Sequence, residues 1–156
     1  MITESDIIDV APDLWVETCA AYRERGFGSV DWLTAVDRGG TLEVLVHLVD
    51  SGAGEEAIVR TCLPVHEPAL PSLSDDFPGA DWHERETREM YGIEFRGRTD
   101  TEPLLLRAGI GEPPMRKAAP LGERVSTPWP GAEEGSGRRR RRLPPGVRAE
   151  WVDPDG

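Results

Sequence analysis

The sequence predicts an α+β fold in which an N-terminal helix packs on a largely antiparallel sheet, followed by a short charged helix and an extended C-terminal tail. Three observations carry this prediction. An amphipathic stretch comes first, three runs with alternating apolar residues follow, and a segment rich in proline, glycine and arginine comes last. We expect one compact domain over residues 1–121 and an extended or disordered tail over residues 122–156.

The first predicted element is a helix between Pro12 and Gly26. Proline suits a first helical turn, and glycine suits the end of a helix. Trp15, Cys19 and Tyr22 then fall on one face. This apolar face is expected to pack on the strands that follow.

Three runs with apolar residues at every second position predict strands over 29–37, 41–50 and 57–63. Gly39-Gly40 separates the first two runs and is typical of a tight hairpin turn. Short turns between such runs favour an antiparallel meander. Because the runs are partly apolar on both faces, we expect helices to cover one face of the sheet and a partner protein to cover part of the other.

The segment 82–95 concentrates charge before it turns apolar, which indicates a surface that meets another protein. Asp81 and Glu84 have the spacing of a capping box, which predicts that a helix begins there. Gly92 is expected to end this helix. An extended path should resume at Ile93.

Three carboxylates of this helix could be taken for catalytic groups. However, Glu84 with Arg88, and Arg85 with Glu89, have the four-residue spacing of surface ion pairs, which favours a structural interpretation. Arg85 and Glu86 are neighbours in the sequence and point to different sides of the helix, so at least one is expected to reach outward or into an interface.

The charge distribution disfavours nucleic acid as a partner. The net charge is −11, with 19 acids against 6 bases in residues 1–90 and 10 acids against 12 bases in residues 91–156. An acidic body repels nucleic acid and anionic lipid. The five arginines at 138–142 are interpreted either as a solvated tail or as a contact for acidic protein or lipid headgroups. No aromatic platform accompanies them, so nucleic-acid binding is the least favoured interpretation.

The sequence contains no spacing typical of a metal or cofactor site. Cys19 and Cys62 are distant from each other; a disulfide between them is an alternative without support, and both are expected to be reduced core residues. His47, His66 and His83 form no ligand pattern with them. We therefore expect no metal, cluster or dinucleotide in this chain.

No signal peptide and no membrane span are predicted. The first residues lack a basic region followed by an apolar one, and the apolar run 42–49 is far too short to cross a bilayer. The chain is expected in the cytoplasm, with any contact to a membrane made through a partner.

The strongest motif is Glu84-Arg85-Glu86 followed by Glu89-Met90-Tyr91-Gly92-Ile93-Glu94-Phe95. It resembles the motif of the 30 kDa-type C subunit of the proton-translocating NADH–quinone oxidoreductase, respiratory complex I. The resemblance extends in order over about residues 26–121 and includes a closing segment with Arg116 and Lys117. The chain departs from the family pattern at 98–101 and at Ala118.

This resemblance implies a cofactor-free, non-catalytic subunit of the peripheral arm, on the cytoplasmic side of the cell membrane. It would dock on subunits D and B, which form the quinone site, near the iron–sulfur subunit. FMN, iron–sulfur clusters and quinone would lie in partner subunits. The residues that would fold and dock the chain are Glu84, Arg85, Glu86, Glu89, Met90, Tyr91, Gly92, Ile93, Arg116 and Lys117.

Two alternatives remain open on the sequence alone. A homologous subunit occurs in membrane-bound nickel–iron hydrogenases and formate hydrogenlyase-type complexes, and it would show the same features. A free-standing acidic adaptor that binds through its arginine-rich tail is the other alternative.

Overall fold

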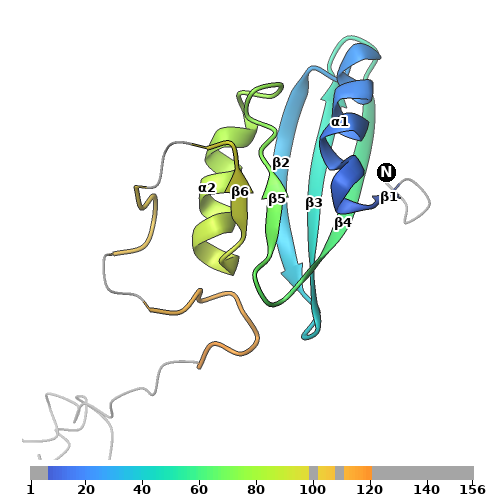
Figure 1. Ribbon diagram of the computed structural model, residues 1–156. Helices are drawn as coiled ribbons and strands as arrows, with labels where there is room; N and C mark the ends of the chain where they lie inside the picture. The colour runs from blue at the N-terminus through green and yellow to red at the C-terminus, as the bar shows by residue number, and fades with distance from the viewer. Residues whose placement is uncertain (1–6, 99–101, 108–110, 121–156) are drawn as a thin grey trace, which may run out of the picture. The chain divides into compact units, whose positions relative to one another are not determined.

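A computed structural model of the chain describes residues 7–98, 102–107 and 111–120. Its α+β fold is the predicted one (Figure 1). In chain order the elements are β1 (Ile7–Val10), the short 3-10 helix η2 (Pro12–Leu14), α1 (Trp15–Glu24), β2 (Ser29–Asp37), β3 (Thr41–Asp50), β4 (Glu55–Pro64), β5 (Ala69–Pro71), α2 (Ala80–Tyr91) and β6 (Glu94–Arg96). The predicted first helix, the meander and the charged helix are therefore confirmed.

The main sheet has four strands in the order β1-β4-β3-β2. The meander β2–β3–β4 is antiparallel, as predicted, whereas β1 pairs in parallel with β4, with Ile7 opposite Ile58. A second sheet joins β5 to β6 in parallel, with Leu70 opposite Phe95. β1 and β5 were not predicted from the sequence; they are 4 and 3 residues long and pair with distant segments.

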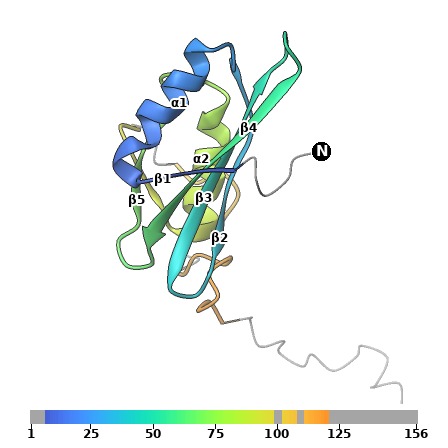
Figure 2. The ribbon, with the colours of Figure 1, turned by 90° about the vertical axis from the view of Figure 1, so that its right-hand side faces the viewer.

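The core lies between the main sheet and the layer that contains α1. Trp15 and Cys19 of α1 pack with alternate residues of β3, including Val44 and Val46, and all four are fully buried. Figure 2 shows α1 and the sheet as two layers, with β5 on the same side as α1. In Figure 1, α2 lies beside β2 at the edge of the sheet.

The opposite face of the main sheet is not covered by any helix or strand of the described chain (Figure 2). Trp32, Leu45 and Ile58 point to this side, because their strand neighbours face the core. His47 is also on this face, 5% exposed, and its ring stacks on Trp32 with 5.3 Å between the ring centroids. We call Trp32, Leu45, His47 and Ile58 the open face of the sheet. The expectation that a partner covers part of it stays a prediction.

The predicted capping box at the start of α2 is wrong. The helix begins at Ala80 after Gly79, and no side chain caps its first turn. The carboxylate of Asp81 instead forms an ion pair with Arg98 at 2.6 Å, and the carboxylate of Glu84 accepts a hydrogen bond from the hydroxyl of Ser72. The predicted end at Gly92 is confirmed, since this glycine has the left-handed backbone (φ 67°) that glycine adopts readily.

The two cysteines are free, as expected, but only one belongs to the core. Cys19 is buried, and the pKa of its thiol is raised to about 12. Burial is the larger cause of this shift, and the nearby charge of Asp76 is the smaller one. Cys62 is exposed, so its predicted core position is wrong. Thr61 and Leu63 of the same strand face the core, and the alternation of a strand turns Cys62 the other way.

The chain divides into two units, residues 1–121 and 122–156. The predicted tail, with Arg138–Arg142, lies outside the described residues. Across the part of the chain that is described, no helix is both long and apolar enough to cross a membrane. No three His, Cys, Asp or Glu side chains of that part lie together in a way that could hold a metal ion.

Candidate functional site: the outer face of α2

The two sides of α2 have different environments. Ala80, Glu84 and Thr87 are buried against the rest of the domain. Trp82 and Glu86, four residues apart, lie on the other side, where Trp82 is 58% exposed. Met90, four residues further, is half-buried and continues this row. We call Trp82, Glu86 and Met90 the outer face of α2.

Glu84 is a buried structural carboxylate. The hydroxyl of Ser72 donates to it at 2.6 Å, the backbone N–H of Leu73 donates at 2.7 Å, and Arg98 Nη1 donates at 3.2 Å. Desolvation raises the pKa of Glu84, although all three donors act in the opposite direction. The predicted surface pair with Arg88 is therefore wrong, because the carboxylate faces inward.

Glu89 holds the segment that follows β6. Its carboxylate accepts hydrogen bonds from three consecutive backbone N–H groups, those of Leu104, Leu105 (2.8 Å) and Leu106 (2.9 Å). Partial desolvation favours a higher pKa for Glu89. The three donors and the charge of Arg85 outweigh it, so the pKa lies below its usual value. Arg85 also donates to the carbonyl oxygen of Glu102 at 3.4 Å.

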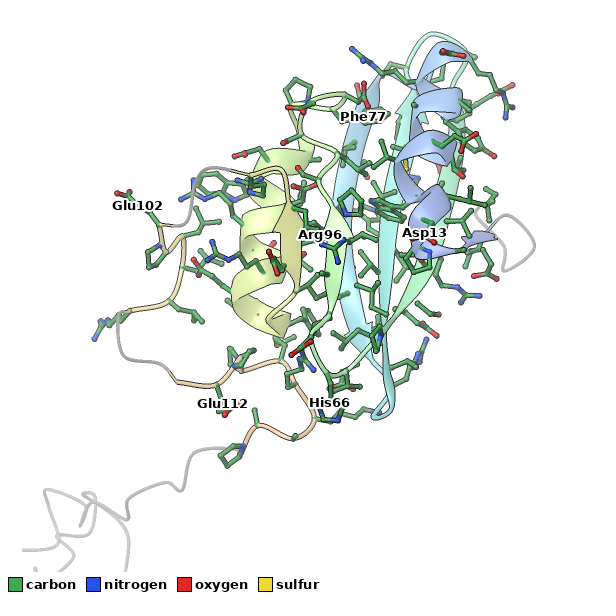
Figure 3. All side chains as sticks on the ribbon, in the orientation of Figure 1. Asp13, His66, Phe77, Arg96, Glu102 and Glu112 are labelled. Carbon is green, nitrogen blue, oxygen red and sulfur yellow. The ribbon has the colours of Figure 1, made fainter. Side chains whose placement is uncertain are left out.

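Figure 3 shows Glu102 on this following segment, on the far side of α2 from the sheet. The hydrogen bonds of Glu89 and Arg85 thus hold residues 102–107 next to α2. The ion pair predicted between Arg85 and Glu89 stays a prediction; the charge of Arg85 does help to lower the pKa of Glu89.

The predicted closing segment packs against the end of α2. The N–H of Met115 donates to the carbonyl of Met90 at 3.0 Å. The guanidinium of Arg116 donates to the carbonyl of Tyr91 and, at 3.0 Å, to that of Val65. The N–H of Lys117 donates to Asp37 at 2.9 Å. The structure thus brings Arg116 and Lys117 together with the motif helix, and Arg116 is used within the domain.

Gly92 lies against the closing segment, next to Pro113 and Arg116. A Cβ atom at Gly92 would approach Pro113 Cγ to 2.9 Å, which is closer than van der Waals contact allows. Ile93, the next motif residue, is fully buried in the core. Gly92, Ile93 and Glu84 therefore serve the fold, and neither Ile93 nor Glu84 has exposed surface to offer a partner.

A small hollow opens beside Glu86. Its lining residues are Thr34, Glu86, Thr87, Met90, Tyr91 and Met115, and its volume is about 220 Å³. Desolvation is the main cause that raises the pKa of Tyr91, followed by the charges of Asp37 and Glu86. Met115 is 55% exposed at the rim. We call this site the Glu86 hollow.

The carboxylate of Glu86 differs from those of Glu84 and Glu89. Among the residues that the structure describes, none donates a hydrogen bond to the Glu86 side chain or forms an ion pair with it. The sequence predicts Glu86 as a residue of this site, but it predicts no role in the site for Trp82 or Met115. Helical spacing from Glu86 could have found Trp82, whereas Met115 arrives from a distant segment.

Comparison with known proteins places these features in a family. The sequence pattern of the family described as "Respiratory-chain NADH dehydrogenase, 30 Kd subunit" matches residues 8–125. The chain belongs to this family. The match includes all of α2 and the closing segment, so the resemblance inferred from the motif is confirmed.

Relatives in this family are named as the C subunit of NADH-quinone oxidoreductase. The one from Roseiflexus sp. (strain RS-1) is 35% identical over 102 residues, which cover 64% of this chain and 59% of the relative. The one from Rhodopseudomonas palustris (strain TIE-1) is 41% identical over 93 residues, 57% of this chain and 45% of the relative. The chain spans about half the length of the curated relatives it matches.

Two solved structures have a similar fold. The trypsin-resistant fragment (1-134) of Nqo5 has a TM-score of 0.57 and 26% sequence identity, covering 60% of this chain and 80% of the fragment. A chain of the membrane-bound sulfane sulfur reductase, an archaeal respiratory membrane complex, has a TM-score of 0.69 and 26% identity, covering 74% of this chain and 71% of that chain.

Proposed function

We propose that this chain is a non-catalytic, cofactor-free subunit in the peripheral arm of an NADH–quinone oxidoreductase, and that it docks through the outer face of α2. Its neighbours would be the counterparts of subunits D and B, with the iron–sulfur subunit nearby. The flavin, the iron–sulfur clusters and the quinone would belong to those partners. Membership of the 30 Kd subunit family supports the assembly.

The observation that supports this proposal best is that most of the exposed large hydrophobic side chains of the described residues lie on or next to α2. Four large hydrophobic side chains are exposed in the described part of the chain: Leu14, Trp82, Leu105 and Met115. Three of them border α2, because Trp82 lies on the helix, Leu105 is bound to Glu89 and Met115 to Met90. Exposed aromatic and methionine side chains are typical of protein interfaces, and here they lie on or next to one helix.

The open face of the sheet supports a second contact with a partner. A sheet with helices on one side only leaves apolar residues such as Trp32 and Leu45 partly exposed. Thr34, which lines the Glu86 hollow, belongs to the same strand as Trp32. The open face and the outer face of α2 therefore adjoin at β2, and one large partner could contact both.

The location follows from the same proposal. The chain would lie peripherally on the cytoplasmic side of the cell membrane and reach the membrane only through the complex. Its acidic charge makes direct binding to anionic lipid unfavourable. Its partners, and not its own side chains, would carry electrons from NADH to quinone.

The experiment is to tag the chain in its native cells, solubilise the membranes gently and identify the proteins that co-purify by mass spectrometry. Counterparts of subunits B and D, together with NADH-dependent quinone reduction, are the expected result. A chain that purifies without any stable partner would contradict the proposal and favour the free-standing adaptor. An adaptor would also lose all binding when residues 122–156 are deleted, whereas a docked subunit would keep it.

A second candidate is a subunit of a related membrane complex, of the sulfane-reductase or hydrogenase type. The sulfane sulfur reductase chain favours it, since its TM-score and coverage of this chain exceed those of the Nqo5 fragment. The same purification separates the two. A large partner with nickel-binding cysteines, or reduction of sulfane sulfur in place of quinone, would assign the chain to the second group.

A further inference from the structure

We infer that Glu86 binds a cationic side chain, arginine or lysine, that a neighbouring subunit inserts into the Glu86 hollow. This inference rests on the proposed docking through the outer face of α2 and names the chemistry at its centre. Three observations support it: the state of three carboxylates on one helix, the size of the hollow and the charge around it.

The three carboxylates of the motif differ in how their oxygens are used. Glu84 accepts from Ser72, Leu73 and Arg98, and Glu89 accepts from three backbone N–H groups. Glu86 accepts from no donor in the described structure, although its residue is half-buried. The Glu86 oxygens are not among the buried polar atoms that lack a partner, so a cationic group from a binding partner can reach them and donate to them.

The hollow suits one long side chain. About 220 Å³ is below the usual volume of a small-molecule site, which is roughly 300–1,000 Å³. Its walls combine Met90, Tyr91 and Met115 with the carboxylate of Glu86. An arginine or lysine could lay its aliphatic stem along the methionines and bring its charged end to Glu86.

The surroundings favour a cation over a neutral donor. Residues 1–90 contain 19 acids and 6 bases, so the body that carries the hollow is strongly acidic. The nearby Arg116 is committed elsewhere, because its guanidinium donates to the carbonyls of Tyr91 and Val65. Charge complementarity at the half-buried Glu86 therefore points to a positively charged group from outside the described chain.

The test is the rate at which the tagged chain leaves the purified complex. We compare wild type with Glu86→Gln, which keeps the shape and removes the charge, and with Glu17→Gln as the matched control. Glu17 is an exposed carboxylate on α1, away from the hollow. Losing one partner of a desolvated charge pair predicts dissociation at least about 30-fold faster for Glu86→Gln, with no change for Glu17→Gln.

Two further readouts exclude a merely structural effect. Thermal unfolding of the isolated Glu86→Gln chain should stay close to wild type, because no described residue donates a hydrogen bond to the Glu86 carboxylate or forms an ion pair with it. Dissociation of the wild-type complex should accelerate with added salt, and Glu86→Gln should respond less, since the screened pair is absent.

The outcomes separate the two claims. If the wild-type chain assembles and Glu86→Gln dissociates at the wild-type rate, the cation at Glu86 is wrong while the subunit proposal stands. If the wild-type chain has no partners, the proposed function fails, and the inference fails with it. Equal acceleration by Glu86→Gln and Glu17→Gln would also overturn the inference, because the effect would then be one of net charge.

Discussion

Arg98 and Glu84 form an ion pair inside the protein, with 3.2 Å between Nη1 and Oε2 and side-chain exposures of 5% and 0%. Arg98 also binds Asp81, through its other Nη at 2.6 Å. Through these two carboxylates Arg98, which follows β6, connects that strand to the first half of α2. The most recognisable motif of the sequence therefore begins with a residue that stabilises the fold. Glu86, two positions later, has no such role.

We predict that Glu84→Ala and Glu86→Ala have very different effects on stability. Glu84→Ala leaves Arg98 and the N–H of Leu73 without their buried acceptor, and the free energy of unfolding should fall by about 3–5 kcal/mol. Glu86→Ala should cost less than about 1 kcal/mol. Chemical denaturation of both variants measures the two values. Similar losses in both variants would show that Glu86 also has a structural role.

Gly92→Ala should destabilise the domain for two separable reasons. The left-handed backbone costs an alanine roughly 1 kcal/mol, and the new Cβ would clash with Pro113 at 2.9 Å. Gly54→Ala is the matched control, because its φ of 70° is nearly that of Gly92 and no atom lies within 4 Å of its Cβ position. The thermal midpoint should fall further for Gly92→Ala. An equal fall would mean that the segment around Pro113 moves away without cost.

The bond between Glu89 and residues 104–106 should weaken at low pH. The pKa of the Glu89 carboxyl in the folded chain lies below the unfolded value of 4.5. The contribution of Glu89 to stability is therefore present above 4.5 and is lost as the pH falls through the folded pKa. The amide proton shifts of Leu105 and Leu106, measured by NMR, should titrate together with a midpoint below 4.5. Glu89→Gln should abolish this titration. A midpoint at or above the unfolded value would contradict the assignment.

The two thiols should react very differently. Cys62 is exposed, whereas Cys19 is buried with its pKa raised to about 12, so at pH near 8 it holds little thiolate. A thiol reagent should therefore modify one cysteine per native chain and both after denaturation. Mass spectrometry of the peptides should place the native label on Cys62. Rapid labelling of Cys19 would mean that the contact of α1 with the sheet opens readily.

The sequence predicts the meander well because its signals are local. Alternation and the Gly39-Gly40 turn placed β2, β3 and the hairpin with the observed boundaries. The same alternation, applied strictly, would have turned Cys62 away from the core, since Thr61 and Leu63 face inward. Cysteine is among the most buried residue types, yet the position of Cys62 in the strand, and not its type, determines its exposure.

Other features could not be predicted because they depend on distant residues. β1 and β5 are short strands whose partners, β4 and β6, lie far along the chain. Asp81 and Glu84 have capping-box spacing, yet Arg98, Ser72 and Leu73 bind their carboxylates. The motif marked the right helix, but only the folded chain separates its structural carboxylates from Glu86.

The central claim is that the outer face of α2 is the docking surface. The most direct measurement is photocrosslinking in the assembled complex, with a photoreactive residue in place of Trp82 and, as control, in place of Glu17 on α1. Crosslinks from position 82 to another subunit, and few from position 17, are the predicted result. Crosslinks from position 17 alone, with position 82 reactive only to solvent, would contradict the account.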